Sequence, residues 1–138
     1  MKLVIISLFY FLNAPAIAET ELVVVVAKNS PVEILNNREV ANIFLSRTKQ
    51  FPNGDRAVPV ERKNNLSRPY FYTRISGKTE NQLEAYWTTL IFTGKGKPPK
   101  SLKSTEKVLM RLNKHPGTIT YMLSNEVTEN MKIVYVFP

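Results

Sequence analysis

Two arginines, a serine and a tyrosine gather between positions 62 and 70, directly after a short apolar run. The guanidinium group of arginine donates two parallel hydrogen bonds to a phosphate or a carboxylate. The first N–H groups of a helix also favour anions, because they have no acceptor within the helix. The segment therefore predicts a small-anion site that consists of Arg62, Ser67, Arg68 and Tyr70. A simpler interpretation stays open, in which Ser67 only caps its own helix and both arginines point to solvent.

A strand end and a helix start would position these groups. The run Ala57–Glu61 predicts a short strand, and Ser67 can begin a helix that accepts Pro69 in its first turn and ends near Gly77. The Val-rich run Leu22–Ala27 predicts a buried parallel strand. Other expected elements are helices capped by Asn36, Thr79 and Ser104, a loop rich in Lys and Pro over 94–103, and closing strands over 118–122 and 132–137.

Strands that alternate with helices predict an α/β domain, in which a mostly parallel sheet is flanked by helices. In the helix after Thr79, the residues Trp87, Leu90 and Ile91 recur at helical spacing and are expected to form one buried face. A chain of 138 residues suits one such domain.

The first residues resemble a signal peptide. Met1-Lys2 is a short positive start, Leu3–Leu12 is an apolar run too short to span a bilayer, and Ala16-Ile17-Ala18 offers a cleavage site. A membrane anchor or a buried first helix is the alternative. We expect a leader over residues 1–18, a domain over 19–138, and a periplasmic or secreted location.

Composition narrows the function. The chain has no cysteine and one histidine, so thiolate and His-rich metal sites are not expected, and no nucleophile–base pair predicts an enzyme. The net charge of +8 favours acidic partners such as small anions. The sequence has no nucleic-acid motif, and export makes a nucleic-acid partner unexpected. We expect neither a cofactor nor a metal.

Three phrases resemble one family: IFLSRTKQFPNGDRAVPVER (43–62), AYWTTLIFTGKGKPP (85–99) and HPGTITYM (115–122). In order and spacing they are similar to the second half of the phosphate-type substrate-binding proteins of bacterial ABC importers. The resemblance implies a single lobe of the periplasmic-binding-protein fold. Those proteins carry Arg-x-x-Gly-Ser-Gly-Thr at the anion; Arg62 and Ser67 match its Arg and Ser, while Leu66 and Arg68 replace its glycines.

The resemblance implies an exported, non-catalytic protein that binds phosphate or a similar small anion for uptake or sensing. Its partner would be an ABC permease or a sensor protein of the cell envelope. The alternative is a protein-interaction module of the envelope, either a homo-oligomer or the partner of another protein, without a small ligand. A single lobe would leave the other side of the anion exposed to water.

We expect the mature protein to begin at Glu19, because the apolar run and the Ala-x-Ala end fit cleavage after Ala18. The intact mass of the protein exported from a Gram-negative host measures this directly. Soluble envelope protein that keeps residues 1–18 would contradict the prediction.

Overall fold

The computed structural model describes residues 20–138, so the expected leader lies outside the described residues. Within the described part, helices and strands alternate along the chain as the sequence predicts. In chain order the elements are β1 (Leu22–Ala27), α1 (Asn37–Phe44), β2 (Val58–Arg62), α2 (Arg68–Ser76), α3 (Glu80–Phe92), β3 (Lys100–Leu102), α4 (Thr105–Lys114), β4 (Thr118–Leu123), the 3-10 turn η1 (Ser124–Glu126) and β5 (Met131–Val136).

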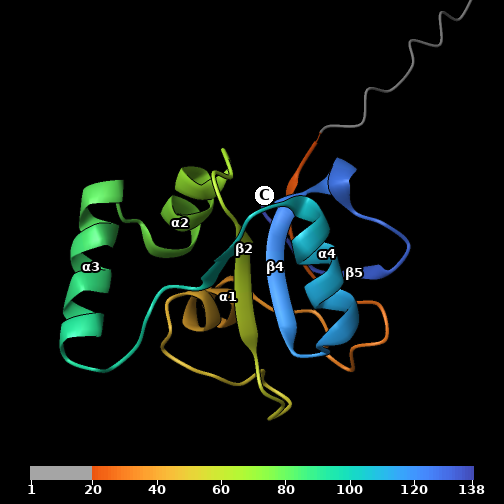
Figure 1. Ribbon diagram of the computed structural model, residues 1–138, viewed down its shortest axis with the longest axis horizontal. Helices are drawn as coiled ribbons and strands as arrows, with labels where there is room; N and C mark the ends of the chain where they lie inside the picture. Colours follow the sequence, from red (N-terminus) through yellow and green to blue (C-terminus); the bar gives the residue numbers. More distant parts are fainter. Residues whose placement is uncertain (1–19) are drawn as a thin grey trace, which may run out of the picture.

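The strands form one sheet in the order β3-β2-β4-β1-β5 (Figure 1). Strand β2 runs parallel to β3 and to β4, whereas β1 runs antiparallel to β4 and to β5. The predicted α/β fold with a mostly parallel sheet is therefore confirmed. The prediction that Leu22–Ala27 is a parallel strand is wrong. Its six residues are all buried, and an apolar run indicates burial without fixing strand direction.

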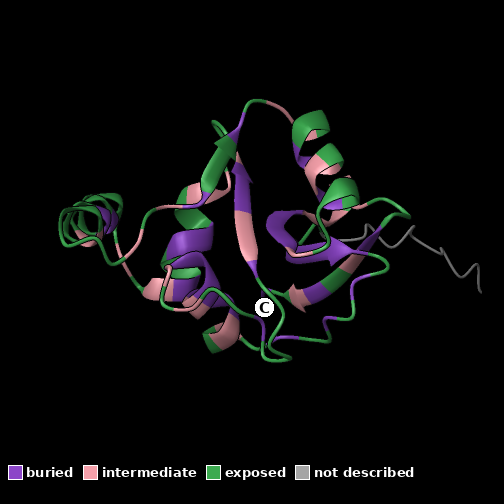
Figure 2. Ribbon diagram, turned by 60° about the horizontal axis from the view of Figure 1, so that its bottom comes forward, coloured by how far each residue is buried: buried purple, intermediate pink, exposed green. Residues whose placement is uncertain are grey.

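Successive side chains of a strand point to opposite faces of the sheet, so the core is divided between the two faces. Val24 and Val26 pack into a large cluster with residues of α1, α2 and α3, while Val23 and Val25 pack into a smaller cluster with residues of α4. Figure 2 shows buried residues in the strands at the centre of the molecule and on the helix faces that pack against them. Helix α4 thus covers one face alone, whereas α1 and α2 cover the other and α3 adds Leu83 and Trp87 to that second cluster from the edge of the molecule.

Local capping fixes most helix starts. Asn36 with Glu39, and Thr79 with Gln82, form the two predicted capping boxes, and the Ser104 hydroxyl accepts from the backbone N–H of Lys107. Strand β3 was predicted as loop. Its sequence Lys-Ser-Leu has no apolar run, and it is a strand because its backbone pairs with the edge of β2.

Helix α3 stands at the edge of the molecule, apart from the sheet (Figure 1). Leu83 and Trp87 are buried, Leu90 is half-buried, and Ile91 is 57% exposed. The expected buried face is therefore wrong at Ile91, because α3 contacts the body along a narrower stripe than its apolar spacing suggests. None of the helices in residues 20–138 has the length and apolarity that a bilayer span requires.

Trp87 gives a test of this packing. Its side chain is 5% exposed, and its Nε1 is buried without a hydrogen-bond partner in the described chain. We expect Trp87→Ala to lower the free energy of unfolding by about 3–5 kcal/mol. Trp87→Phe should cost much less, since it also removes an unpaired polar group. Urea unfolding of the three proteins measures both effects. Equal midpoints for Trp87→Ala and the wild type would contradict the packing.

Candidate functional site

The end of β2 determines where the predicted anion-binding residues lie. Consecutive strand residues point to opposite faces of a sheet, so Glu61 and Arg62 separate. Glu61 points toward α2, where it contacts Tyr72, and Arg62 points toward α4, where it contacts Thr105. The segment therefore supplies groups to both faces, and its two arginines do not share one partner.

The α2 face holds a buried carboxylate. Glu61 is 3% exposed, and its two oxygens accept hydrogen bonds from the Tyr72 hydroxyl at 3.2 Å and the Tyr121 hydroxyl at 2.7 Å. The Nε atom of Arg68 lies 3.5 Å from Glu61 Oε2, and its guanidinium lies over the Tyr72 ring at 4.9 Å. The outer nitrogen of Arg68 donates to both oxygens of Glu80 at 3.0 and 3.1 Å.

Burial dominates the electrostatics of this cluster. It raises the pKa of Glu61, although the hydrogen bond from Tyr121 and the charge of Arg68 oppose the change. Burial likewise raises the pKa of Tyr72 and of Tyr121, and the neighbouring carboxylate adds to both effects. Burial alone would lower the pKa of Arg68, but Glu61, Tyr72 and Glu80 together raise it. Arg68 therefore stays charged.

Asn65 holds the turn that precedes α2. Its side-chain Oδ1 accepts from the Ser67 N–H at 2.9 Å, and its backbone oxygen accepts from the Arg68 N–H at 3.1 Å. Ser67 occupies the N-cap position, but its hydroxyl makes no capping bond, so the expected role of Ser67 as a capping side chain is wrong. Pro69 has no N–H to offer. Much of the donor set that a helix start offers an anion is thus already used.

On the opposite face, Arg62 donates to the Thr105 hydroxyl at 3.0 Å and to Glu126 Oε1 at 3.3 Å. The other oxygen of Glu126 accepts from the Leu123 N–H at 2.9 Å. Both sequence-predicted arginines therefore hold a glutamate of the same chain.

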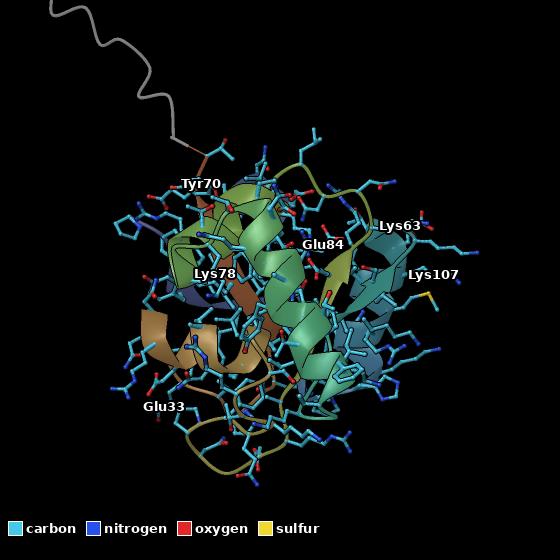
Figure 3. The ribbon with its side chains drawn as sticks, turned by 90° about the vertical axis from the view of Figure 1, so that its left-hand side faces the viewer. Glu33, Lys63, Tyr70, Lys78, Glu84 and Lys107 are labelled. Atoms are coloured by element: carbon cyan, nitrogen blue, oxygen red, sulfur yellow. The ribbon has the colours of Figure 1, made fainter. Side chains whose placement is uncertain are left out.

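Tyr70 lies apart from these groups. Its side chain is 50% exposed, it lies at the outer rim in Figure 3, and Arg74 lies over its ring at 5.7 Å. The structure thus brings Ser67 and Arg68 to one helix start, with Arg62 on the other face and Tyr70 outside. That any of these four residues binds an anion stays a prediction.

The sequence reasoning missed the acceptors: Glu61, Glu80 and Glu126. A signal existed for Glu61, which ends an apolar strand and is followed by the arginine-rich segment. The other contacts bridge distant positions and have no local signature. Among residues 20–138 no group of three or more metal-binding side chains converges.

Solved structures resemble this fold. A Clostridium perfringens protein described as a phosphate ABC transporter substrate-binding protein, solved with bound phosphate, matches with a TM-score of 0.64 and 14% identity over 83% of this chain and 44% of its own. An ABC-type phosphate transport receptor from Vibrio cholerae matches with a TM-score of 0.62 and 14% identity over 83% and 45%. Drosophila muscle GluRIIB, in complex with glutamate, matches with a TM-score of 0.51 and 9% identity over 86% and 42%.

No protein-family model matches the sequence, and no curated protein matches it. The chain spans less than half the length of the three solved proteins. At such low identity the likeness shows the fold alone, which confirms the predicted periplasmic-binding-protein-like lobe. Its correspondence to the second lobe stays a prediction.

The pKa of Glu61 predicts a dependence of stability on pH. Its folded-state pKa lies above the ordinary value of 4.5, so the folded protein holds this proton more tightly than the unfolded chain. As the pH rises from about 4.5 through the folded-state pKa, Glu61 therefore lowers the free energy of unfolding; above that range its contribution is constant. Glu61→Gln should remove this decline.

Urea unfolding at several pH values from 4 to 8 compares the two proteins, with circular dichroism to confirm that both are folded at each pH. The difference between their free energies of unfolding should change with pH in the stated direction. A difference that is constant over the range would contradict the assignment.

Proposed function

We propose that this chain is an exported, non-catalytic binding domain whose ligand is a small oxyanion of the phosphate type, recognised for uptake or sensing. The observation that carries the proposal is the pair of arginines at the end of β2 and the start of α2, each of which already holds a carboxylate. A guanidinium group that binds a carboxylate also fits a phosphate, because both offer adjacent oxygens. The partner would be an ABC permease or an envelope sensor.

The accessible position for the ligand is the outer nitrogen of Arg68. Its partner there, Glu80, has a side chain that is 53% exposed, so the pair contributes little to stability and an outside anion can replace it. The inner nitrogen of Arg68 lies beside the buried Glu61 carboxylate, which fixes the direction of the guanidinium. Ser67 lies next to it at the helix start.

The same contacts limit affinity. The Ser67 and Arg68 N–H groups are bonded to Asn65, and Glu80 competes for the guanidinium. One lobe also leaves a side of the anion in water, which weakens each charge-assisted bond. A loss of about 4 kcal/mol turns a micromolar dissociation constant into a roughly millimolar one.

An interaction module is the second candidate, and the surface of α3 favours it. Phe92 is 91% exposed and lies next to Ile91 at the end of the helix that stands apart from the sheet. Exposed apolar patches of this kind are typical of protein contacts. Under this alternative, the sedimentation coefficient rises with protein concentration and Phe92→Ser abolishes the rise.

We expect the purified monomer to bind phosphate with a dissociation constant of about 1 mM or weaker. Arg68→Ala should abolish this binding, and Arg68→Lys should weaken it because the planar fork is lost. Arg47→Ala removes the same charge at an exposed position and is the matched control.

Calorimetry with phosphate measures these constants, after circular dichroism has confirmed that each variant is folded. Micromolar binding by a monomer would contradict the single-lobe argument. If Arg47→Ala and Arg68→Ala lower the affinity for phosphate equally, the effect is one of net charge and Arg68 does not form a specific site. Micromolar binding by a dimer alone would show that another copy completes the anion site.

A further inference from the structure

A small pocket lies at the start of α4, on the sheet face opposite Arg68. It has a volume of about 20 Å³. Its walls combine polar groups from β2, the loop after it, α4, β4 and η1 with a few apolar side chains. The polar members are Arg62, Asn65, Thr105, Thr120 and Glu126.

Thr120 is the feature of this pocket that has no structural explanation. The residue is 1% exposed, and its Oγ1 is buried without a hydrogen-bond partner in the described chain. Its strand position pairs with Val25, which belongs to the core cluster under α4, so its side chain points to the α4 face and into the pocket. A buried hydroxyl without a partner is rare, since its desolvation costs about 1–3 kcal/mol.

The other polar groups around this hydroxyl are mainly donors. Asn65 uses its Oδ1 for the Ser67 N–H, so its Nδ2 is the side of the amide left to donate. Thr105 Oγ1 accepts from Arg62 and keeps its own proton for another acceptor. Thr105 also begins α4, a helix of ten residues whose first N–H groups have no acceptor within the helix.

One acceptor faces these donors. Glu126 places Oε1 at 3.3 Å from Arg62, and its side chain is about as exposed as that of Arg62, at 29% and 35%. The carboxylate is therefore a half-buried group at the mouth of a pocket that otherwise offers donors, and an anion that replaces it must also displace its Oε2 from the Leu123 N–H at 2.9 Å. In Figure 3, Lys63 and Lys107 both lie along the side of the molecule that carries β3 and α4, so the surroundings add positive charge.

We propose that this pocket binds a small tetrahedral oxyanion, phosphate or sulfate, and that Glu126 occupies the position of the anion in the free protein. The existing cavity holds about one water molecule, so the oxyanion enters when the Glu126 carboxylate swings out. Arg62, Thr105 and Thr120 then donate to its oxygens, and the start of α4 faces its charge. The proposal rests on the proposed function and gives it a second locus, which does not depend on Arg68.

Amide chemical shifts in the purified, isotope-labelled protein test the proposal without any mutation. Phosphate and sulfate are titrated separately, and sodium chloride of equal ionic strength corrects for screening. We expect saturable shifts at the amides of Thr105, Glu106 and Thr120. Shifts confined to Ser67–Tyr70 would support the proposed function and overturn this second locus. Shifts confined to the start of α4 would support this second locus and overturn Arg68 as the position of the ligand. No saturable shift at either place would overturn both.

Variants then separate an anion site from a position for one ordered water. Glu126→Gln removes the competing charge and keeps the size, so the anion should bind about tenfold more tightly. Thr120→Val keeps the shape and removes the hydroxyl, and in the Glu126→Gln background it should reverse most of that gain. The matched control is Glu80→Gln, which frees Arg68 on the other face and should leave the shifts at α4 unchanged.

An unchanged affinity in Glu126→Gln would overturn the proposal. So would a Thr120→Val variant that binds as well as its parent, because Thr120 would then only hold a water molecule. A saturable response to phosphate but not to sulfate would restrict the ligand to phosphate, and equal responses would define a general oxyanion site.

Discussion

A buried carboxylate joins the parts of this fold that carry its chemistry. Glu61 receives hydrogen bonds from Tyr72 of α2 and Tyr121 of β4, and Arg68 lies beside it. A buried ion of this kind costs several kcal/mol unless its partners are well placed. The two tyrosines and the arginine therefore offset the cost of burying Glu61, and their contacts fix the start of α2 against the sheet. Phe71, stacked on Tyr121 at 3.8 Å, adds an apolar contact at the same junction.

Strand geometry determines what that junction can bind. Because Glu61 and Arg62 are consecutive in β2, one serves the α2 face and the other serves the α4 face. In the sequence, only five residues separate the two arginines, which suggested that both reach one anion. In the structure each arginine has its own glutamate. Asn65 connects the two places, because it accepts from the Ser67 N–H before α2 and also lines the pocket under α4.

Local signals in the sequence predict much of the fold. The helix boundaries follow from two capping boxes, the Ser104 cap and the left-handed conformation of Gly77. The apolar run Leu22–Ala27 predicts that β1 is buried. The direction and the pairing of a strand depend on partners that are distant in sequence. Local signals therefore did not predict the antiparallel direction of β1 or the pairing of β3 at the edge of the sheet. Of the charged groups in the candidate site, only the arginines were predicted from the sequence. Several partners lie far away in sequence: the Tyr121 hydroxyl donates to Glu61, and Glu126 accepts from Arg62.

The glutamates that bind the two arginines compete with any oxyanion for the same guanidinium groups. A side chain tethered beside an arginine acts at an effective concentration of about millimolar or higher, so a free anion must exceed that value or offer more contacts. A phosphate can do so by accepting hydrogen bonds from additional hydroxyl and backbone donors, and the Thr120 hydroxyl, which has no partner in the described chain, is the one proposed for this role. Although the chain has a net charge of +8, both arginines are paired with glutamates of the same chain, so any external oxyanion has to compete with a carboxylate that is already in place.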